Sequence, residues 1–268
     1  MAWASQREIE HVELLVEQSA GVVARRAGCF RDPVGVWNVS GRQANGAEPA
    51  PVPTPRVPAL DALDHVASLR QAGLDIVIEH GQVMGEVLGL EVARVVVDEG
   101  DPRVEVGVGR HDREAFTLVH GDLPTADALA RVIAEVRRHR RPGNRTHPLS
   151  RLAGERWLRS VLVRSPELVG ARSLEPAEPT IARDNVLDPA PAIAVGEAHD
   201  GGAIVVAAST GVDLDLVPSA ADARLAHAPG ARLVLAVPDR DALEVTRQLA
   251  NRLVESADVV TVPSTFRD

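Results

Sequence analysis

The sequence lacks lysine and tyrosine altogether, and it contains one cysteine, Cys29. Without lysine the chain has no Schiff-base amine and no phosphate-loop cation, which excludes several classes of enzyme. A single cysteine cannot form a disulfide within the chain, so we expect a reducing, cytoplasmic location and no four-thiolate zinc site. All 29 basic side chains are arginine, a composition typical of a GC-rich genome.

Aromatic residues and long apolar runs are also scarce. Aromatics make up 2% of the chain, so the core must consist mostly of Val, Leu, Ile and Ala. No apolar run reaches the roughly 18 to 20 residues that cross a bilayer. The N-terminus becomes charged at Arg7 and has no apolar signal-peptide segment. We therefore expect no membrane association.

Proline is concentrated in two stretches, at 46–58 and 175–191, which we interpret as linkers. They divide the chain into four parts: an N-terminal helix with a Pro-rich linker at 1–57, a strand hairpin with Arg-rich helices at 58–175, a connector at 176–190 and an α/β unit at 191–268.

In the N-terminal half, helical spacing and caps predict several helices. Ser5 and Glu8 form a capping-box pattern that predicts a helix as far as Gly28, and a second helix should follow Pro58 and end at Gly73. Further helices are expected at 112–121, at 125–141 and from Leu149 to Leu162. Val- and Leu-rich strands are expected at 74–78, 83–97 and 103–109, with a hairpin turn at 98–102 and a bulge or bend at Gly85 and Gly89.

The C-terminal part has a different pattern. Two strands flank a turn at 199–202, and the order strand 233–237, helix 242–253, strand 259–262 predicts a parallel βαβ unit. The expected fold class is α/β (α+β), with an antiparallel hairpin and packed helices in the middle and a mixed sheet with a βαβ unit at the C-terminus.

Three segments carry a resemblance to a known group of proteins: GEVLGLEVARV at 85–95, VEVGVGRHDREAF at 104–116 and DLDLVPSAADARL at 213–225. Together they resemble a family of uncharacterised proteins from high-GC Gram-positive bacteria, over about residues 75 to 263. The resemblance implies no activity and no site residues, because the family has no known function.

Charge is unevenly distributed along the chain. Residues 131–172 hold eleven arginines against three glutamates, whereas the whole chain has a net charge of −9. Such a segment could neutralise the phosphates of a polyanion or of a phosphorylated ligand, or it could face acidic parts of its own molecule. The candidate anion-binding residues are Arg137, Arg138, Arg140, Arg141 and Arg145, and the helix expected at 125–141 should expose the first four of them near its C-terminus.

A metal-dependent phosphodiesterase of the nuclease kind is the alternative, with Glu86, Glu91 and Glu105 as its carboxylates. The turn at 98–102 predicts that Glu105 lies opposite Val95, with Glu91 on the same face about 13 Å away. Carboxylates that far apart cannot share a metal ion, so we expect no metal site there. Two weaker groups of candidates have simpler interpretations. His80, His111 and His120 are interpreted as surface or loop residues. Asp213, Asp215, Asp239 and Asp241 follow the C-terminal strands, and Asp241 with Glu244 forms a pattern that starts a helix, which indicates a structural role.

The sequence therefore favours a non-catalytic cytosolic accessory protein, without a cofactor, that binds an anionic partner through its Arg-rich helices. The phosphodiesterase remains the second hypothesis, so the sequence leaves open whether the protein is an enzyme.

Overall fold

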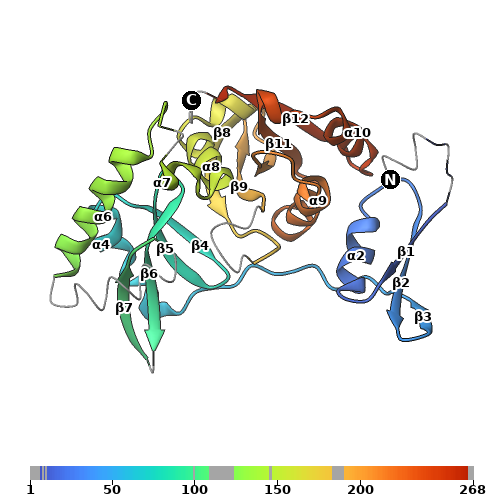
Figure 1. The fold of residues 1–268 in the computed structure, drawn as a ribbon, viewed down its shortest axis with the longest axis horizontal. Coiled ribbons are helices and arrows are strands. Elements are labelled where there is room, and N and C mark those ends of the chain that lie inside the picture. Colours follow the sequence, from blue (N-terminus) through green and yellow to red (C-terminus); the bar gives the residue numbers. More distant parts are fainter. Residues whose placement is uncertain are drawn as a thin grey trace.

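A computed structural model describes residues 7, 9, 11–98, 100–108, 124–144, 147–182 and 190–264. These residues form helices and three sheets of three, four and five strands, so the predicted mixed α and β fold class is confirmed (Figure 1). The five-stranded sheet lies in the middle of the molecule. The three-stranded and four-stranded sheets lie at opposite ends. In the described residues, no helix has the length and apolar character needed to span a membrane.

The N-terminal unit differs from the prediction. Its elements are β1 (Val12–Val16), α2 (Ala20–Ala27), β2 (Val34–Ser40) and β3 (Gln43–Gly46). The continuous helix expected up to Gly28 is wrong, because the first half of its described part is β1, which pairs in parallel with β2. Val12 and Val16 fit both a helical and an alternating pattern, and pairing with β2 decides between them.

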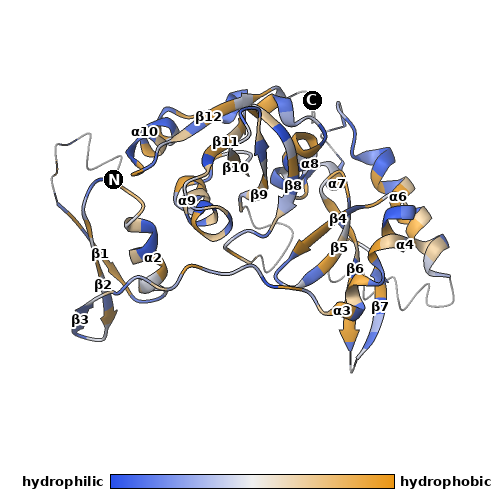
Figure 2. Cartoon of the chain, turned by 180° about the vertical axis from the view of Figure 1, so that it is seen from behind, coloured by the Kyte–Doolittle hydropathy of each residue, from blue (hydrophilic) through white to orange (hydrophobic). Residues whose placement is uncertain are grey.

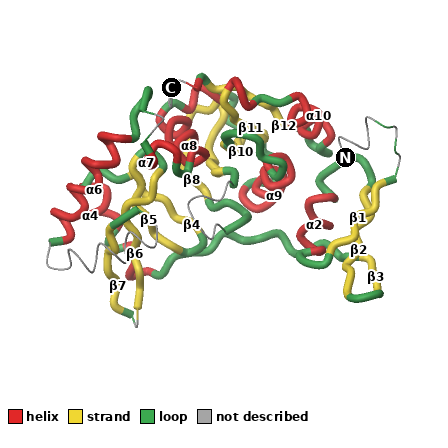
Figure 3. Tube along the Cα trace, in the orientation of Figure 1, coloured by secondary structure: helices red, strands yellow, loops and turns green. Residues whose placement is uncertain are grey.

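An extended Pro-rich segment leads from this unit to the four-stranded sheet at the other end of the molecule, as the tube in Figure 3 shows. The predicted linker is thus present as an extended segment. Before it, the N-terminal unit is held against the C-terminal unit: α2 contacts α9 (Leu216–His227), and Phe30 forms an isolated bridge with Leu253.

The middle unit is an antiparallel meander in the order β4-β5-β6-β7, covered by helices. Its elements are α3 (Leu60–Leu63), α4 (Val66–Gln71), β4 (Asp75–Glu79), β5 (Gln82–Val87), β6 (Leu90–Asp98), β7 (Asp101–Val106), α6 (Thr125–His139) and α7 (Pro148–Arg151). The cap at Gly73, whose φ is 85°, is confirmed. The helix expected at 112–121 lies outside the described residues.

The long strand expected at 83–97 is wrong in one respect, because it is two strands joined by a tight turn at Leu88 and Gly89. Gly89 has a φ of 75°, and a Cβ at this position would lie 2.2 Å from the backbone carbonyl of Arg156. Only glycine fits there, since the turn adopts a left-handed conformation and lies directly against the backbone of α8 (Gly154–Arg164). The expected irregularity near Gly85 is confirmed as a shift of register between Gly85 and Glu86.

The C-terminal unit is a sheet in the order β12-β11-β10-β9-β8, in which β10, β11 and β12 are parallel. Its elements are α8 (Gly154–Arg164), a 3₁₀ turn (Pro166–Val169), β8 (Ala171–Ala177), β9 (Ala192–Ala198), β10 (Ala203–Ala208), α9 (Leu216–His227), β11 (Arg232–Pro238), a 3₁₀ turn (Asp239–Asp241), α10 (Glu244–Arg252) and β12 (Ala257–Val262). The predicted hairpin at 199–202 and the βαβ unit are confirmed.

Helices cover both faces of this sheet, as the two opposite views in Figures 1 and 2 show. Side chains of α9 and α10 form one core with the sheet, and Trp157, Leu158 and Leu162 of α8 belong to the core on the other side. The single helix expected from Leu149 to Leu162 is wrong, because Ala153 has a φ of 43° and separates α7 from α8. This break allows α8 to lie between the two larger sheets.

Candidate functional site

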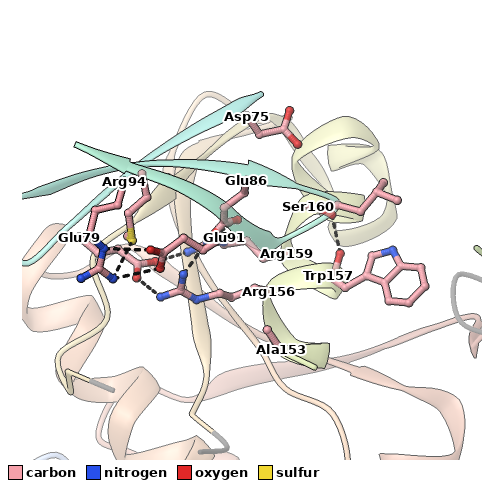
Figure 4. Close-up of polar contacts among 12 residues, drawn as sticks. Asp75, Glu79, Glu86, Glu91, Arg94, Ala153, Arg156, Trp157, Arg159 and Ser160 are labelled. Atoms are coloured by element: carbon pink, nitrogen blue, oxygen red, sulfur yellow. Dashed lines mark hydrogen bonds and ion pairs between the residues drawn. The ribbon is translucent and has the colours of Figure 1, made fainter. Parts of the chain in front are cut away.

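Helix α8 has two faces of different chemistry. Its apolar face packs on β8, β9 and β10 of the five-stranded sheet. From its other side, Arg156 and Arg159 extend toward the four-stranded sheet, where they meet two glutamates, Glu79 of β4 and Glu86 of β5 (Figure 4). The spacing of three residues puts both arginines on one face of the helix.

These four side chains form a buried network of ion pairs. Arg159 donates to Glu79 at 2.6 Å and to the two carboxylate oxygens of Glu86 at 3.1 and 3.2 Å. Arg156 donates to Glu86 at 2.9 Å and also to Glu79. The side chains of Glu86 and Arg159 are 2% and 1% exposed. The network therefore joins the two units through charges that water does not screen.

The carboxylates keep Arg156 charged despite its burial. Desolvation alone would lower the pKa of Arg156, but the negative charges of Glu79, Glu86 and Glu91 outweigh it and raise the pKa above the ordinary value. A buried ion pair of this kind costs desolvation energy to form, and removing one partner leaves the other charge uncompensated. The network is thus a specific connection between two units.

The carboxylates of the phosphodiesterase hypothesis are arranged differently from the prediction. Glu86 and Glu91 are direct partners across β5 and β6, so the structure brings them together. Glu105 lies opposite Arg94 and not opposite Val95, because the turn closes with Asp98 paired to Asp101. The predicted register was therefore wrong by one residue.

The oxygen atoms of these carboxylates accept hydrogen bonds from arginine side chains. Arg94 donates to both oxygens of Glu91, at 2.9 and 3.0 Å, and Arg103 donates to Glu105 at 3.2 Å. Glu86 is held by α8, as described above. In the part of the chain that the structure describes, no three acidic, histidine or cysteine side chains are grouped so that they could hold a metal ion.

Among the members of the predicted anion site that the structure describes, Arg140 alone is buried. Its side chain is 1% exposed and donates to the carbonyl oxygens of Leu88, Leu149, Leu152 and Ala153 at 2.7 to 3.0 Å. Its guanidinium also lies 4.5 Å from the centre of the Trp157 ring. The expectation that Arg140 is exposed is wrong, since it connects the end of α6 with α7, α8 and the β5–β6 turn.

Three other members of the predicted site are exposed at the C-terminal end of α6. Arg137 donates to the carbonyl oxygen of Gly73, Arg141 donates to the carbonyl oxygen of Arg137, and Arg138 pairs with Glu135. Within the described residues, no carboxylate pairs with Arg137 or Arg141. Arg145 lies outside the described residues.

Of the other arginines in the 131–172 segment, four form ion pairs with acids of other elements. Arg156, Arg159, Arg164 and Arg172 pair with Glu79, Glu86, Asp75 and Glu197 in other parts of the fold. Arg131 and Arg151 are exposed. A part of the segment therefore faces acidic parts of its own molecule, which was one of the two interpretations of the charge pattern.

The histidine and aspartate candidates serve local structure where they are described. Nδ1 of His80 lies 3.1 Å from the carboxylate of Glu178, whereas His111 and His120 lie outside the described residues. After β10, Asp213 accepts from Ser209 and from the amide of Asp215, and Asp241 accepts from the amide of Gly211. Asp241 does not start α10, whose first residue is Glu244.

Sequence reasoning did not predict the network around Arg159. A signal was present, because Glu86 lies within an apolar strand and Glu79 directly follows another apolar segment, and an acid buried at such a position requires a cationic partner. Comparison of the chain with models of protein families, with curated proteins and with solved structures gives no match.

Proposed function

We propose that the protein is a non-catalytic accessory protein that binds a polyanion through the exposed arginines at the end of α6. The proposal depends on a difference between neighbouring arginines. Arg140 is buried and fixes the β5–β6 turn, whereas three arginines beside it are exposed to solvent: Arg137, Arg138 and Arg141. A fixed cationic surface loses little conformational freedom when it binds phosphates.

The chemistry of this surface favours the backbone of a nucleic acid. Arginine forms forked hydrogen bonds with phosphate oxygens. The C-terminal end of a helix carries a partial negative charge, so the arginine side chains alone supply the positive potential of this surface. Aromatic residues are scarce in the sequence, so base stacking would contribute little. We therefore expect binding that depends on charge and is insensitive to base sequence.

The phosphodiesterase alternative has less support. Its mechanism needs carboxylates that are free to bind a metal ion, and the oxygens of Glu86 and Glu91 accept hydrogen bonds from arginines. No observation on the described residues favours catalysis over binding.

The proposal can be tested by fluorescence anisotropy with labelled double-stranded RNA and DNA over a series of salt concentrations. The test variant replaces Arg137, Arg138 and Arg141 by Gln. The control replaces Arg172, Arg232 and Arg240 by Gln, which changes the net charge equally at exposed arginines paired elsewhere. A plot of the logarithm of the association constant against the logarithm of the salt concentration has a negative slope. We expect the magnitude of this slope to decrease by about 2 to 3 in the test variant and by less than about 1 in the control.

Two results would overturn the proposal. One is the absence of binding to either duplex at about 50 mM salt, where phosphate contacts are strong. The other is an equal loss of affinity in the two triple variants, which would mean that only the total charge matters.

A further inference from the structure

A cavity opens between the two larger units, beside the buried ion pairs. It has a volume of about 240 Å³ and lies between α4, β4, α8 and β8. Clefts at the junction of two units are common ligand sites in proteins. Because this cavity is smaller than those that hold drug-sized molecules, which are about 300 to 1,000 Å³, its size fits a small molecule.

The walls of the cavity are mostly apolar. They are formed by side chains from both units: Leu74, Ile76, Val77, Val163 and Pro176. Glu86 and Arg159 also line the cavity, and they are buried and already paired with each other. A ligand would therefore place an apolar body between the walls without breaking an existing ion pair.

The other charged side chains that line the cavity are more exposed. Arg70 and Arg164 are exposed, and Asp75 pairs with Arg164 at 2.5 Å. In the described part of the chain, no carboxylate pairs with Arg70. The lining thus holds three arginines and two acids, which leaves one positive charge without a counterion.

We propose that this cavity binds a small monoanionic carboxylate with an apolar body. Its carboxylate would accept charge-assisted hydrogen bonds from Arg70 and from the donors of Arg164 that Asp75 does not occupy. Its aliphatic or aromatic part would pack against the walls contributed by β4 and α8. None of the arginines of α6 lines the cavity, so the inference does not depend on the proposed function.

Titration followed by two-dimensional ¹H–¹⁵N NMR tests this inference with three probes. Benzoate has both the charge and the apolar ring, benzamide lacks the charge, and inorganic phosphate lacks the apolar body. We expect benzoate to shift the amide signals of residues 74–77 and 159–164 with a millimolar Kd, as few contacts allow. Benzamide and phosphate should bind at least about tenfold more weakly.

Arginine variants locate the carboxylate. Arg70→Gln and Arg164→Gln should each weaken benzoate binding about tenfold, because each removes a charge-assisted hydrogen bond. Arg172→Gln is the matched control, since Arg172 is also exposed and paired with an acid but does not line the cavity. The inference is overturned by any of three results: no binding of benzoate, equal binding of benzamide or phosphate, or equal affinity in all three variants.

The two proposals fail separately. Loss of benzoate binding in Arg164→Gln with unchanged RNA affinity supports the cavity alone. Loss of RNA binding in the α6 triple variant with unchanged benzoate affinity supports the proposed function alone.

Discussion

Arg159 and Glu86 are separated by 73 residues in the sequence, and they form an ion pair in which both side chains are almost completely buried. Arg159 belongs to the helix that packs on the five-stranded sheet, and Glu86 belongs to the four-stranded sheet. This pair and its neighbours Arg156 and Glu79 thus hold the two larger units in one relative position.

Glu86→Gln should destabilise the protein by about 3 to 5 kcal/mol, because the substitution leaves Arg159 buried with part of its charge uncompensated. Urea unfolding followed by circular dichroism measures the change. Glu197→Gln is the control, since its ion pair with Arg172 is exposed and should contribute less than about 1 kcal/mol. Equal effects of the two substitutions would contradict the structural role of the network.

Arg140→Met should also destabilise the fold, by about 2 to 4 kcal/mol, because four carbonyl oxygens lose their donor while the methionine still fills the space. Arg141→Gln, one residue later and exposed, should change the free energy of unfolding by less than about 0.5 kcal/mol. Thermal unfolding of both variants checks the difference. If Arg140→Met were as stable as Arg141→Gln, the assignment of Arg140 as a structural residue would be wrong.

The fold was predictable where local chemistry decides it. Glycine at position 73 marks the cap after α4, and the turn at 199–202 marks the β9–β10 hairpin. β1 was missed because Val12 and Val16 fit a helix as well as a strand, and β8 was missed because Pro176 and nearby charges resemble a linker. At both positions, pairing with a distant strand overrides the local pattern.

The candidate sites were predictable only in part, for a related reason. The concentration of arginine in 131–172 is visible in the sequence, but the partner of each arginine is not. Arg140 and Arg141 are neighbours in sequence, yet one is buried and the other is exposed. That difference depends on the β5–β6 turn and on α7, whose positions only the folded chain reveals.

Asp213 should contribute a measurable pH dependence to stability. Burial raises its pKa above the ordinary 3.8, and repulsion from Asp215 and Glu155 acts in the same direction. The folded state therefore holds its proton more tightly than the unfolded state, so this group penalises the fold at neutral pH, and the penalty diminishes as the pH falls through the folded pKa toward 3.8.

The experiment on Asp213 compares the wild type with Asp213→Asn, which keeps an oxygen for the amide of Asp215. The free energy of unfolding of the wild type relative to this variant should increase between pH 7 and about pH 4. Urea unfolding at a series of pH values gives both curves, and other acids cancel in the difference. A constant difference, or one of opposite sign, would show that the pKa of Asp213 is not raised in the fold.

The docking of the N-terminal unit centres on Asp222, a fully buried acid of α9 that accepts from Arg25 at 2.6 and 2.9 Å and from Arg26 at 3.2 Å. Cys29 lies at the end of the same helix as these arginines. Burial raises the pKa of its thiol, and the charge of Asp222 raises it further.

Cys29 can therefore report whether the N-terminal unit stays docked. Asp222→Asn weakens the ion pairs with Arg25 and Arg26, which should loosen the docked unit and expose Cys29. The substitution also removes a negative charge that raises the pKa of Cys29, so more of the thiol should be in the reactive thiolate form. The rate of reaction with iodoacetamide at pH 7.5 should rise at least about fivefold, a change that corresponds to about 1 kcal/mol.

Asp258→Asn is the control, because it removes an equal charge from an exposed pair with Arg232 and should leave the rate unchanged. Since the sequence has no other cysteine, the labelled site is unambiguous. An unchanged rate in Asp222→Asn would contradict both effects: Asp222 would not raise the pKa of Cys29, and contacts such as the Phe30–Leu253 bridge would hold the unit in place without the buried acid.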